Sequence, residues 1–368
     1  MKINIFFFIS RFTFGGAGNA IFTFLNNLDR KKFNLHIFFL GNSEYEKILP
    51  KYVKFYKLKV NYNIFKTFFC FFEIRKILKE KTKDFKKNIF ISNIHYSNVL
   101  SIIFLQKIKN LKLILFERTS IKELDIFENL FSFIKNKIVK FLIGLTYSQA
   151  DAVLTNSKTL SLELRKFNIR SKVVYSGSIK RLLKSNNSKK KKLLFFNMIA
   201  VGRLSSQKDY FTLLKAINLL DCKNFRLSIF GSGEQRKKIE KFIKDNELNQ
   251  YVKLRGHEKD KKKIYQKADL LIHTAIFEGL PNVLVEAMNF RVPVIAADSP
   301  GGTRELLESG KYGQLFEPQN HFELAKKIKD FILNPQKLNK KIINSKIILK
   351  KFTHKSSTKS LEKILNSI

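Results

Sequence analysis

Two carboxylates eight positions apart, Glu278 and Glu286, flank the predicted start of a helix. Pro281 suits the first turn of that helix, because its missing N–H costs nothing there. A helix that begins here points backbone N–H groups and the positive end of its dipole into the preceding loop, and both favour a diphosphate. These N–H groups belong to Asn282, Val283 and Leu284. Carboxylates beside an anion site could accept hydrogen bonds from sugar or ribose hydroxyls; the alternative is a helix start with ordinary surface acids.

A pair of cations precedes this region in the chain. Arg203 follows the apolar run 196–201, which is typical of a strand, and Lys208 comes five residues later. At the end of a strand the two side chains can neutralise a diphosphate, and arginine adds bidentate geometry. Taken alone, such a pair is more often part of a solvated surface.

Three polar residues in the first half of the chain also follow predicted strands. His95 comes after residues 88–92, and Glu117 and Arg118 come after residues 112–116. Ligands bind beyond the carboxyl ends of the strands in parallel α/β sheets, so His95 is a candidate for substrate contact. The alternative is a structural histidine. For Glu117 and Arg118, an internal ion pair or a strand-end cap is the alternative to substrate contact.

The elements that position these residues alternate between strand and helix. Apolar runs predict buried parallel strands at 2–9, 35–40, 88–92, 112–116 and 152–155, and again at 196–201, 226–230, 252–254, 270–273 and 294–296. Helices are predicted at 19–29, 211–220 and 235–245, the first after a glycine-rich turn at 15–18. We therefore predict an α/β fold with two Rossmann-like parallel-sheet domains facing across a cleft.

A basic run without apolar residues, 184–192, marks the predicted domain boundary. We expect an N-terminal domain at 1–183, a linker at 184–192 and a C-terminal domain at 193–350. Residues 351–368 are predicted to form a helix that packs back toward the N-terminal domain. A length of 368 residues fits about two domains.

The composition is that of a globular protein, with 44% hydrophobic and 27% charged residues. Uninterrupted apolar runs are too short for a transmembrane helix, which needs about 18 residues. Cys70 and Cys222 are too few and too far apart for a disulfide framework or a cysteine-rich zinc site. This cysteine usage favours the cytosol.

The net charge of +40, from 70 basic and 30 acidic residues, favours polyanionic partners. These could be phosphorylated substrates, an anionic membrane or nucleic acid, although a coding bias toward A and T would also enrich lysine. The absence of a recognisable nucleic-acid motif argues against specific nucleic-acid binding. Residues 51–87 and 125–145 mix lysines with large apolar residues, which predicts peripheral contact with an anionic membrane; a core-facing helix with a solvated face is the alternative.

The ordered set of motifs in the second half resembles retaining glycosyltransferase family 4. The resemblance covers roughly residues 199–318, whereas the first half matches mainly through its strand–glycine–helix opening. It is carried by Gly202-Arg203-Leu204 with Lys208, Phe230-Gly231-Ser232-Gly233-Glu234, Glu278-Gly279-Leu280-Pro281 with Glu286, and Gly301-Gly302 with Glu305. The resemblance implies the GT-B fold, with the donor nucleotide in the C-terminal domain.

The resemblance also implies roles for individual residues. Arg203 and Lys208 would neutralise the nucleotide diphosphate, Glu286 would hold the ribose, and Glu278 would contact the transferred sugar. Backbone groups at Asn282, Val283 and Leu284 would bind phosphate oxygens, His257 would lie at the nucleobase, and Gly15 and Gly16 would let the first domain close on the diphosphate.

The implied reaction moves a hexose or N-acetylhexosamine from a nucleotide sugar, with a UDP-sugar favoured, to a glycan acceptor that is lipid-linked or part of a lipopolysaccharide or capsule. Such acceptors imply a place at the cytoplasmic face of the membrane. A sugar-nucleotide epimerase of the same fold is the alternative. At the strand end where many relatives carry a histidine near the transferred sugar, this chain has Glu117-Arg118. The chain also contains no Asp-x-Asp, the motif that holds a metal ion in the other major transferase fold. We therefore expect no metal or other cofactor.

Overall fold

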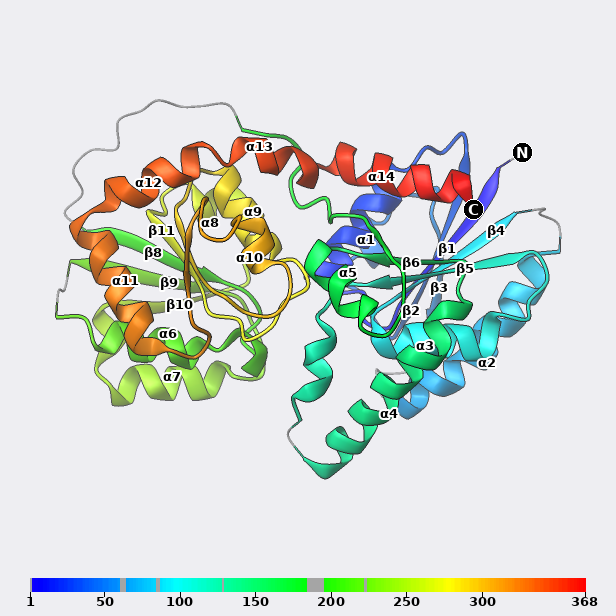
Figure 1. Cartoon of the computed structure of the whole chain (residues 1–368), viewed down its shortest axis with the longest axis horizontal. Coiled ribbons are helices and arrows are strands. Elements are labelled where there is room, and N and C mark those ends of the chain that lie inside the picture. The colour runs from blue at the N-terminus through cyan, green and yellow to red at the C-terminus, as the bar shows by residue number, and fades with distance from the viewer. Residues whose placement is uncertain (1, 60–63, 84–86, 128, 184–194, 222–223) are drawn as a thin grey trace. The chain divides into compact units, whose positions relative to one another are not determined.

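The structure is a computed structural model that describes residues 2–59, 64–83, 87–127, 129–183, 195–221 and 224–368. The chain forms two compact units (Figure 1). Unit 1 comprises Met1–Ser178 together with His354–Ile368, and unit 2 comprises Ile179–Thr353. The predicted linker 184–192 and Cys222 lie outside the described residues.

Unit 1 contains a parallel sheet of seven strands in the order β3-β2-β1-β4-β5-β6-β7, which is the Rossmann order with one added edge strand. Its strands are β1 (Ile3–Ile9), β2 (Phe33–Leu40), β3 (Lys54–Leu58), β4 (Asn88–Asn93), β5 (Leu111–Glu117), β6 (Ala152–Thr155) and β7 (Lys172–Val173). The central strand β1 is apolar on both faces because helices cover both sides of the sheet.

Two hydrophobic layers enclose this sheet. Phe6 and Phe8 of β1 pack in the layer formed with α2 (Ile64–Lys81), α3 (His95–Leu105), α4 (Leu130–Thr146) and α5 (Lys158–Arg165). Ile5 and Phe7 pack in the opposite layer with α1 (Gly16–Asn27) and α14 (His354–Ser367). Figure 1 shows α14 alongside α1, so residues from both ends of the sequence complete this core.

Helix α4 is apolar on two sides. Val139 and Ile143 are buried against unit 1, whereas a second apolar stripe is exposed to solvent at helical spacing. The exposed stripe consists of Leu130, Ile134, Ile138, Phe141 and Leu145, whose exposed fractions range from 49% to 72%. Within the described residues, no helix combines the length and apolarity needed to cross a bilayer.

Unit 2 contains a six-stranded parallel sheet in the order β10-β9-β8-β11-β12-β13. Its strands are β8 (Phe196–Val201), β9 (Phe225–Phe230), β10 (Val252–Gly256), β11 (Leu270–His273), β12 (Val294–Ala297) and β13 (Gln314–Phe316). Its helices are α6 (Tyr210–Asn218), α7 (Arg236–Asp245), α8 (Lys261–Tyr265), α9 (Asn282–Asn289), α10 (Thr303–Leu306), α11 (His321–Leu333), α12 (Pro335–Ile343) and α13 (Lys346–Leu349). The predicted α/β class with two Rossmann-like units is confirmed.

All ten predicted strands are present, and β3, β7 and β13 were not predicted. Strand β3 pairs only with β2 at the edge of its sheet, and its residues Lys54–Leu58 are mostly exposed, so no apolar run marks it. Strands β7 and β13 span two and three residues, which is too short for a periodic pattern.

Helix α1 begins three residues earlier than the predicted start at residue 19. Its second glycine, Gly18, packs directly on the chain that enters the helix, because a Cβ added there would lie 2.1 Å from the carbonyl oxygen of Thr13. The turn after β1 therefore depends on the missing side chain of Gly18.

We predict that Gly18→Ala lowers the free energy of unfolding by about 1–3 kcal/mol, because the added methyl forces the backbone apart. Gly144→Ala in α4 is the matched control: its nearest neighbour would be Phe167 Cδ1 at 3.6 Å. That change should stabilise the helix by about 0.5–1 kcal/mol. Urea unfolding followed by circular dichroism distinguishes the two, and equal effects of the same sign would refute the packing argument.

Candidate active site

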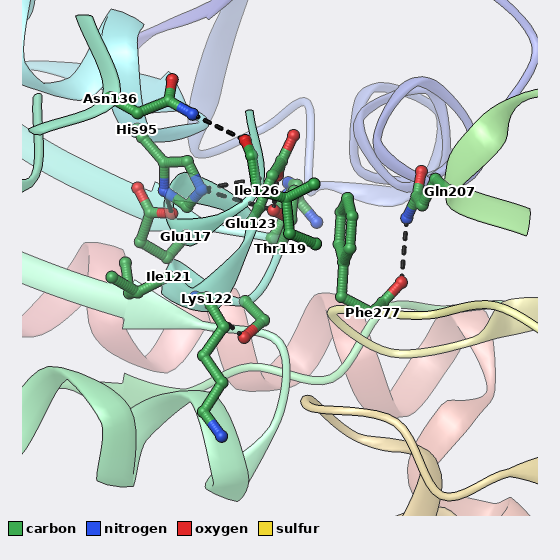
Figure 2. A network of polar contacts seen from close by, with 12 residues as sticks. His95, Glu117, Thr119, Ile121, Lys122, Glu123, Ile126, Asn136, Gln207 and Phe277 are labelled. Atoms are coloured by element: carbon green, nitrogen blue, oxygen red, sulfur yellow. Dashed lines mark hydrogen bonds and ion pairs between the residues drawn. The ribbon is translucent and has the colours of Figure 1, made fainter. Parts of the chain in front are cut away.

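Three loops contact one another in unit 2. They follow the strands β8, β11 and β12. The amide of Gln207 donates a hydrogen bond to the Phe277 carbonyl at 3.0 Å, as Figure 2 shows, and the Ile276 N–H donates to the Gln207 carbonyl at 2.9 Å. The Thr274 hydroxyl donates to the Lys208 carbonyl at 2.7 Å. These bonds join the loop that carries Lys208 to the loop that carries Glu278.

Glu278 is a buried carboxylate with a cation and a histidine beside it. Its side chain forms an ion pair with Lys208 and lies 3.2 Å from His273 Nε2. Burial opposes the charge, but the Lys208 ammonium and contact with His273 lower the pKa of Glu278 to about 2. Burial, aided by Lys208, lowers the pKa of His273, so the ring is neutral at pH 7. Glu278 is therefore ionised and held in place by Lys208.

The backbone of Glu278 is fixed by the loop after β12. Its N–H donates to the Pro300 carbonyl at 2.9 Å, and the Gly302 N–H donates to the Gly279 carbonyl at 2.7 Å. Gly301 has a φ of +110°, and a Cβ there would lie 1.7 Å from the Glu278 carbonyl oxygen. The two glycines therefore allow the loop after β12 to pack against the loop that carries Glu278. These contacts hold the backbone of Glu278 in place.

Glu286 has a separate set of partners on α8. The Tyr265 hydroxyl donates to Glu286 Oε2 at 2.8 Å, and Lys261 Nζ lies 2.9 Å from the same oxygen. Tyr265 is fully buried, and burial together with the nearby carboxylate raises its pKa well above the usual value. Tyr265 therefore stays protonated and orients Glu286.

Helix α9 begins where the sequence predicts it, but one of the three N–H groups assigned to the anion is already bonded. The helix begins at Asn282 with Pro281 immediately before it. The N–H of Leu284, however, already donates to the Pro281 carbonyl at 3.0 Å. An anion at this helix end would therefore meet Asn282 and Val283, which are half-buried, and not Leu284.

The remaining predicted contacts lie on the solvent side of their strand ends. Arg203 is exposed just after β8, and His257 is exposed just after β10. In unit 1, Gly15 precedes α1 and Gly16 begins it, with the Asn19 N–H donating to the Gly15 carbonyl at 2.8 Å. Among the residues that the structure describes, no group of three or more His, Cys, Asp or Glu is arranged to hold a metal ion.

In unit 1, His95 and Glu117 form a buried ion pair at the carboxyl ends of β4 and β5 (Figure 2). His95 Nδ1 lies 2.5 Å from Glu117 Oε2, and both side chains are at least 95% buried. The other oxygen of Glu117 accepts from the Tyr147 hydroxyl and the Asn98 amide, each at 2.5 Å. The Glu117 carboxylate is thus occupied by groups of the chain itself.

The opposite edge of the His95 ring faces a second carboxylate. His95 Nε2 lies 3.6 Å from Glu123 Oε2 and 3.3 Å from the Thr119 hydroxyl, which donates to Glu123. Burial opposes protonation, but Glu117 and Glu123 raise the pKa of His95 to about 10. His95 is therefore an imidazolium at pH 7.

Arg118 is directed into unit 1 and not toward solvent. Its Nε donates to Asn93 Oδ1 at 2.7 Å, and its guanidinium lies 3.7 Å from the centre of the Phe116 ring. Burial, partly offset by the charge of Glu117, lowers its pKa to about 9. Arg118 and Glu117 thus match the structural alternative for this pair more closely than direct substrate contact.

Several residues of these sites were not singled out from the sequence. Lys261 and Tyr265 come 25 and 21 positions before Glu286, and no local spacing indicates that α8 and α9 meet. His273 lies in the apolar strand β11; it is buried there and also contacts Glu278. The apolar strand that contains it gave no signal of that contact.

The chain is similar to two named transferases of one bacterium, to one of them over nearly its whole length. It is 29% identical over 360 residues, 94% of this chain and 92% of the relative, to the GalNAc-alpha-(1->4)-GalNAc-alpha-(1->3)-diNAcBac-PP-undecaprenol alpha-1,4-N-acetyl-D-galactosaminyltransferase of Campylobacter jejuni. It is also 29% identical over 205 residues, 55% of this chain and 56% of the relative, to the N-acetylgalactosamine-N,N'-diacetylbacillosaminyl-diphospho-undecaprenol 4-alpha-N-acetylgalactosaminyltransferase of the same organism.

Solved structures share the fold at low sequence identity. The structure of Anabaena HepE in complex with UDP-glucose aligns with a TM-score of 0.80 at 22% identity and covers 100% of both chains. Sucrose-phosphate synthase from Thermosynechococcus elongatus aligns with a TM-score of 0.84 at 16% identity, covering 100% of this chain and 99% of the other. These similarities confirm the predicted GT-B fold.

We predict that Glu117→Gln lowers the free energy of unfolding by about 3–5 kcal/mol at neutral pH, because it leaves His95 buried without its closest counter-charge. The pKa of His95 is raised from 6.5 in the unfolded chain to about 10. The stabilisation is therefore complete below about pH 6.5 and lost as the pH rises through about 10. In urea unfolding, the difference in the free energy of unfolding between wild type and variant should be smaller at pH 10 than at pH 6.

Glu240→Gln is the control, since Glu240 forms an exposed pair with Arg236 and should change stability by less than about 1 kcal/mol at either pH. A gap between wild type and Glu117→Gln that stays constant from pH 6 to pH 10 would contradict the role given to the ion pair.

A family match completes the assignment. Residues 178–347, which include nearly all of unit 2, match the glycosyl transferases group 1 family. The match contains Arg203, Lys208, Glu278 and Glu286, and the relatives named above are transferases. The chain is therefore a glycosyltransferase with the GT-B fold, and its residues 178–347 match the family model of glycosyl transferases group 1.

Proposed function

We propose that this enzyme transfers a hexose or N-acetylhexosamine, with retention of configuration, from a UDP-sugar to a lipid-linked or surface-polysaccharide glycan. The observation that carries the proposal is the fixed, ionised Glu278 paired with Lys208 at the strand ends of unit 2. Relatives named for transfer onto undecaprenol-linked sugars support the acceptor class, and the UDP-glucose complex of HepE supports the donor class.

In this proposal the donor diphosphate binds between the cations and the helix start. Lys208 and the exposed Arg203 neutralise its charge, and the amides of Asn282 and Val283 meet its oxygens. Glu286, oriented by Tyr265, accepts hydrogen bonds from the ribose hydroxyls. Lys261 shares the same carboxylate oxygen and would move aside or bridge to the nucleotide.

Glu278 then accepts a hydrogen bond from a hydroxyl of the transferred sugar. Its depressed pKa suits this role, because an ionised carboxylate is purely an acceptor. The reaction passes through an oxocarbenium-like state in which the leaving diphosphate gains negative charge. Stabilising that charge lowers the barrier more than a strong base would, and Arg203, Lys208 and the α9 amides are placed for it.

In unit 1, His95 is proposed to act at the substrate and Glu117 to position it. The short contact between the two and the double hydrogen bonding of Glu117 support this division of roles. Gly15 and Gly16, at the start of α1, are proposed to admit the diphosphate when the substrate is bound. His257 remains the proposed neighbour of the nucleobase.

We propose that turnover needs no metal ion, because Arg203 and Lys208 supply the positive charge and the chain lacks Asp-x-Asp. A sugar-nucleotide epimerase and a nucleic-acid-binding protein are less well supported. The named relatives are transferases, and most phenylalanines of β1 and β2 are buried in the cores, where they cannot stack on bases.

We predict that a UDP-sugar binds the purified chain in calorimetry and that Arg203→Ala and Glu286→Ala each weaken binding about 10–100-fold. Each change removes a charge-assisted hydrogen bond of about 1.5–3 kcal/mol. A chelator should leave binding and turnover unchanged.

Arg236→Ala and Glu240→Ala are matched controls, because they remove the same charges from an exposed pair on α7. Binding that survives both site variants would refute the donor site. Turnover that requires manganese would refute metal independence alone.

The proposed membrane contact rests on the exposed apolar stripe of α4. Lys135 and Lys137 lie on the same helix, so the stripe has cationic neighbours that complement an anionic bilayer surface. On α2 the exposed rings of Phe69 and Phe72 add a second apolar patch, and α3 packs between α2 and α4. We propose that this side of unit 1 rests on the cytoplasmic face of the membrane, where lipid-linked acceptors are available.

We predict that the protein floats with vesicles containing anionic lipid at low salt and that Ile138→Ser/Phe141→Ser lowers binding by at least about tenfold. The two side chains, 52% and 67% exposed, would lose burial in the bilayer worth about 1.5–3 kcal/mol each. The control Leu333→Ser/Ile343→Ser, at 67% and 54% exposure in unit 2, should bind as wild type. Equal flotation of both variants would show that the exposed stripe of α4 does not mediate membrane binding.

A further inference from the structure

A cationic hollow of about 280 Å³ opens in unit 1 at the amino ends of β1, β2 and β3. Ligands of parallel α/β sheets bind at the carboxyl ends of the strands, where His95 and Gly15 lie. One strand length of seven residues, about 23 Å, separates the two ends. The hollow is therefore distinct from the site proposed for donor and acceptor.

Positive charge dominates the wall of the hollow. Lys2, Arg30, Lys54 and Lys81 come from four separate segments, and no carboxylate is among those lining residues that the structure describes. The carboxylate of Glu80 pairs with Lys81 Nζ at 3.0 Å, but Glu80 itself does not line the hollow. Like charges gathered at one place repel one another unless an anion joins them.

The floor of the hollow is built from polar groups that are buried or, for Asn34, half-buried. Asn34 donates to Asn4 Oδ1 at 3.1 Å, and Asn4 donates to Asn88 Oδ1 at 2.9 Å, so the two lining amides are held in fixed orientations. His36 is 94% buried, with Nδ1 3.3 Å from the Tyr56 hydroxyl. The imidazole and the fixed amides therefore make the floor of the hollow polar and not apolar.

We propose that this hollow binds a small phosphate-bearing anion, such as inorganic phosphate, pyrophosphate or a sugar phosphate, as a site separate from catalysis. Pockets for larger ligands start near 300 Å³, so the volume favours a ligand smaller than a nucleotide sugar. Lysine and arginine supply the charge, and the amides and the imidazole supply hydrogen bonds to the remaining oxygens.

His36 provides a direct reporter for the test. Burial, with Lys54 and Lys81 nearby, lowers its pKa to about 4. A bound anion cancels part of that positive field and should raise the pKa, whereas an anion bound elsewhere should not. The experiment titrates the full chain with phosphate and with pyrophosphate at constant ionic strength. Calorimetry gives the affinity, and NMR of labelled histidine follows the His36 ring across the pH range.

The variant Lys54→Gln/Lys81→Gln should weaken pyrophosphate binding at least about tenfold, since each lysine gives a charge-assisted contact. It should also raise the pKa of His36 before any anion is added. Lys237→Gln/Lys241→Gln removes the same charge from exposed positions on α7 and should bind like wild type. Equal weakening in both variants, or no saturable shift of His36 with either anion, would overturn the proposal. UDP-sugar binding should be unaffected in all variants, so this result does not depend on the donor site.

Discussion

A buried carboxylate needs positive charge and hydrogen-bond donors beside it. The carboxyl ends of the strands in unit 2 are organised around one such group. Glu278 meets Lys208 and His273 through its side chain and the loop after β12 through its backbone. The loops after β8 and β11 are joined by hydrogen bonds that keep Lys208 within reach. Without the Glu278 carboxylate, the half-buried ammonium of Lys208 would lose its counter-charge beside the three loops.

This arrangement also bears on how the donor would be recognised. Lys208 is already paired with Glu278, so a diphosphate bound as proposed would compete with Glu278 for the same ammonium. The competition costs little if Lys208 contacts both, and Arg203, which is exposed, adds a second cation without breaking an internal bond. The site would then favour a ligand that brings both a diphosphate and a hydroxyl for Glu278.

Unit 1 satisfies a buried carboxylate by a different set of donors. Glu117 is neutralised by the His95 imidazolium and receives hydrogen bonds from Tyr147 and Asn98 on separate elements. Because Glu117 and Glu123 raise the pKa of His95 to about 10, the ring stays protonated at neutral pH. The pair therefore places a ring that is cationic at neutral pH at the strand ends.

The sequence predicted the elements better than it predicted the contacts between them. Doubly buried parallel strands must be apolar on both faces, so β1, β4 and β8 were recognisable as runs, whereas the exposed edge strand β3 was not. The positions of Arg203 and Lys208 after β8 and of Glu278 after β11 were predictable because each follows an apolar run, whereas the ligand contacts assigned to them and to Glu286 stay predictions. The partners of Glu286 and the burial of Arg118 depend on helices that meet only in three dimensions, which no local pattern encodes.

The placement of α14 has a consequence for how the protein is made. Leu361 and Leu365 complete the core on the α1 side of unit 1, and Glu362 accepts from the Asp29 N–H at 3.0 Å. All of unit 2 is translated between the two parts of unit 1. On the ribosome, the first 178 residues therefore emerge with one face of their sheet only partly covered. Unit 2 can close its core first, and the unit that begins the chain is the last to be finished.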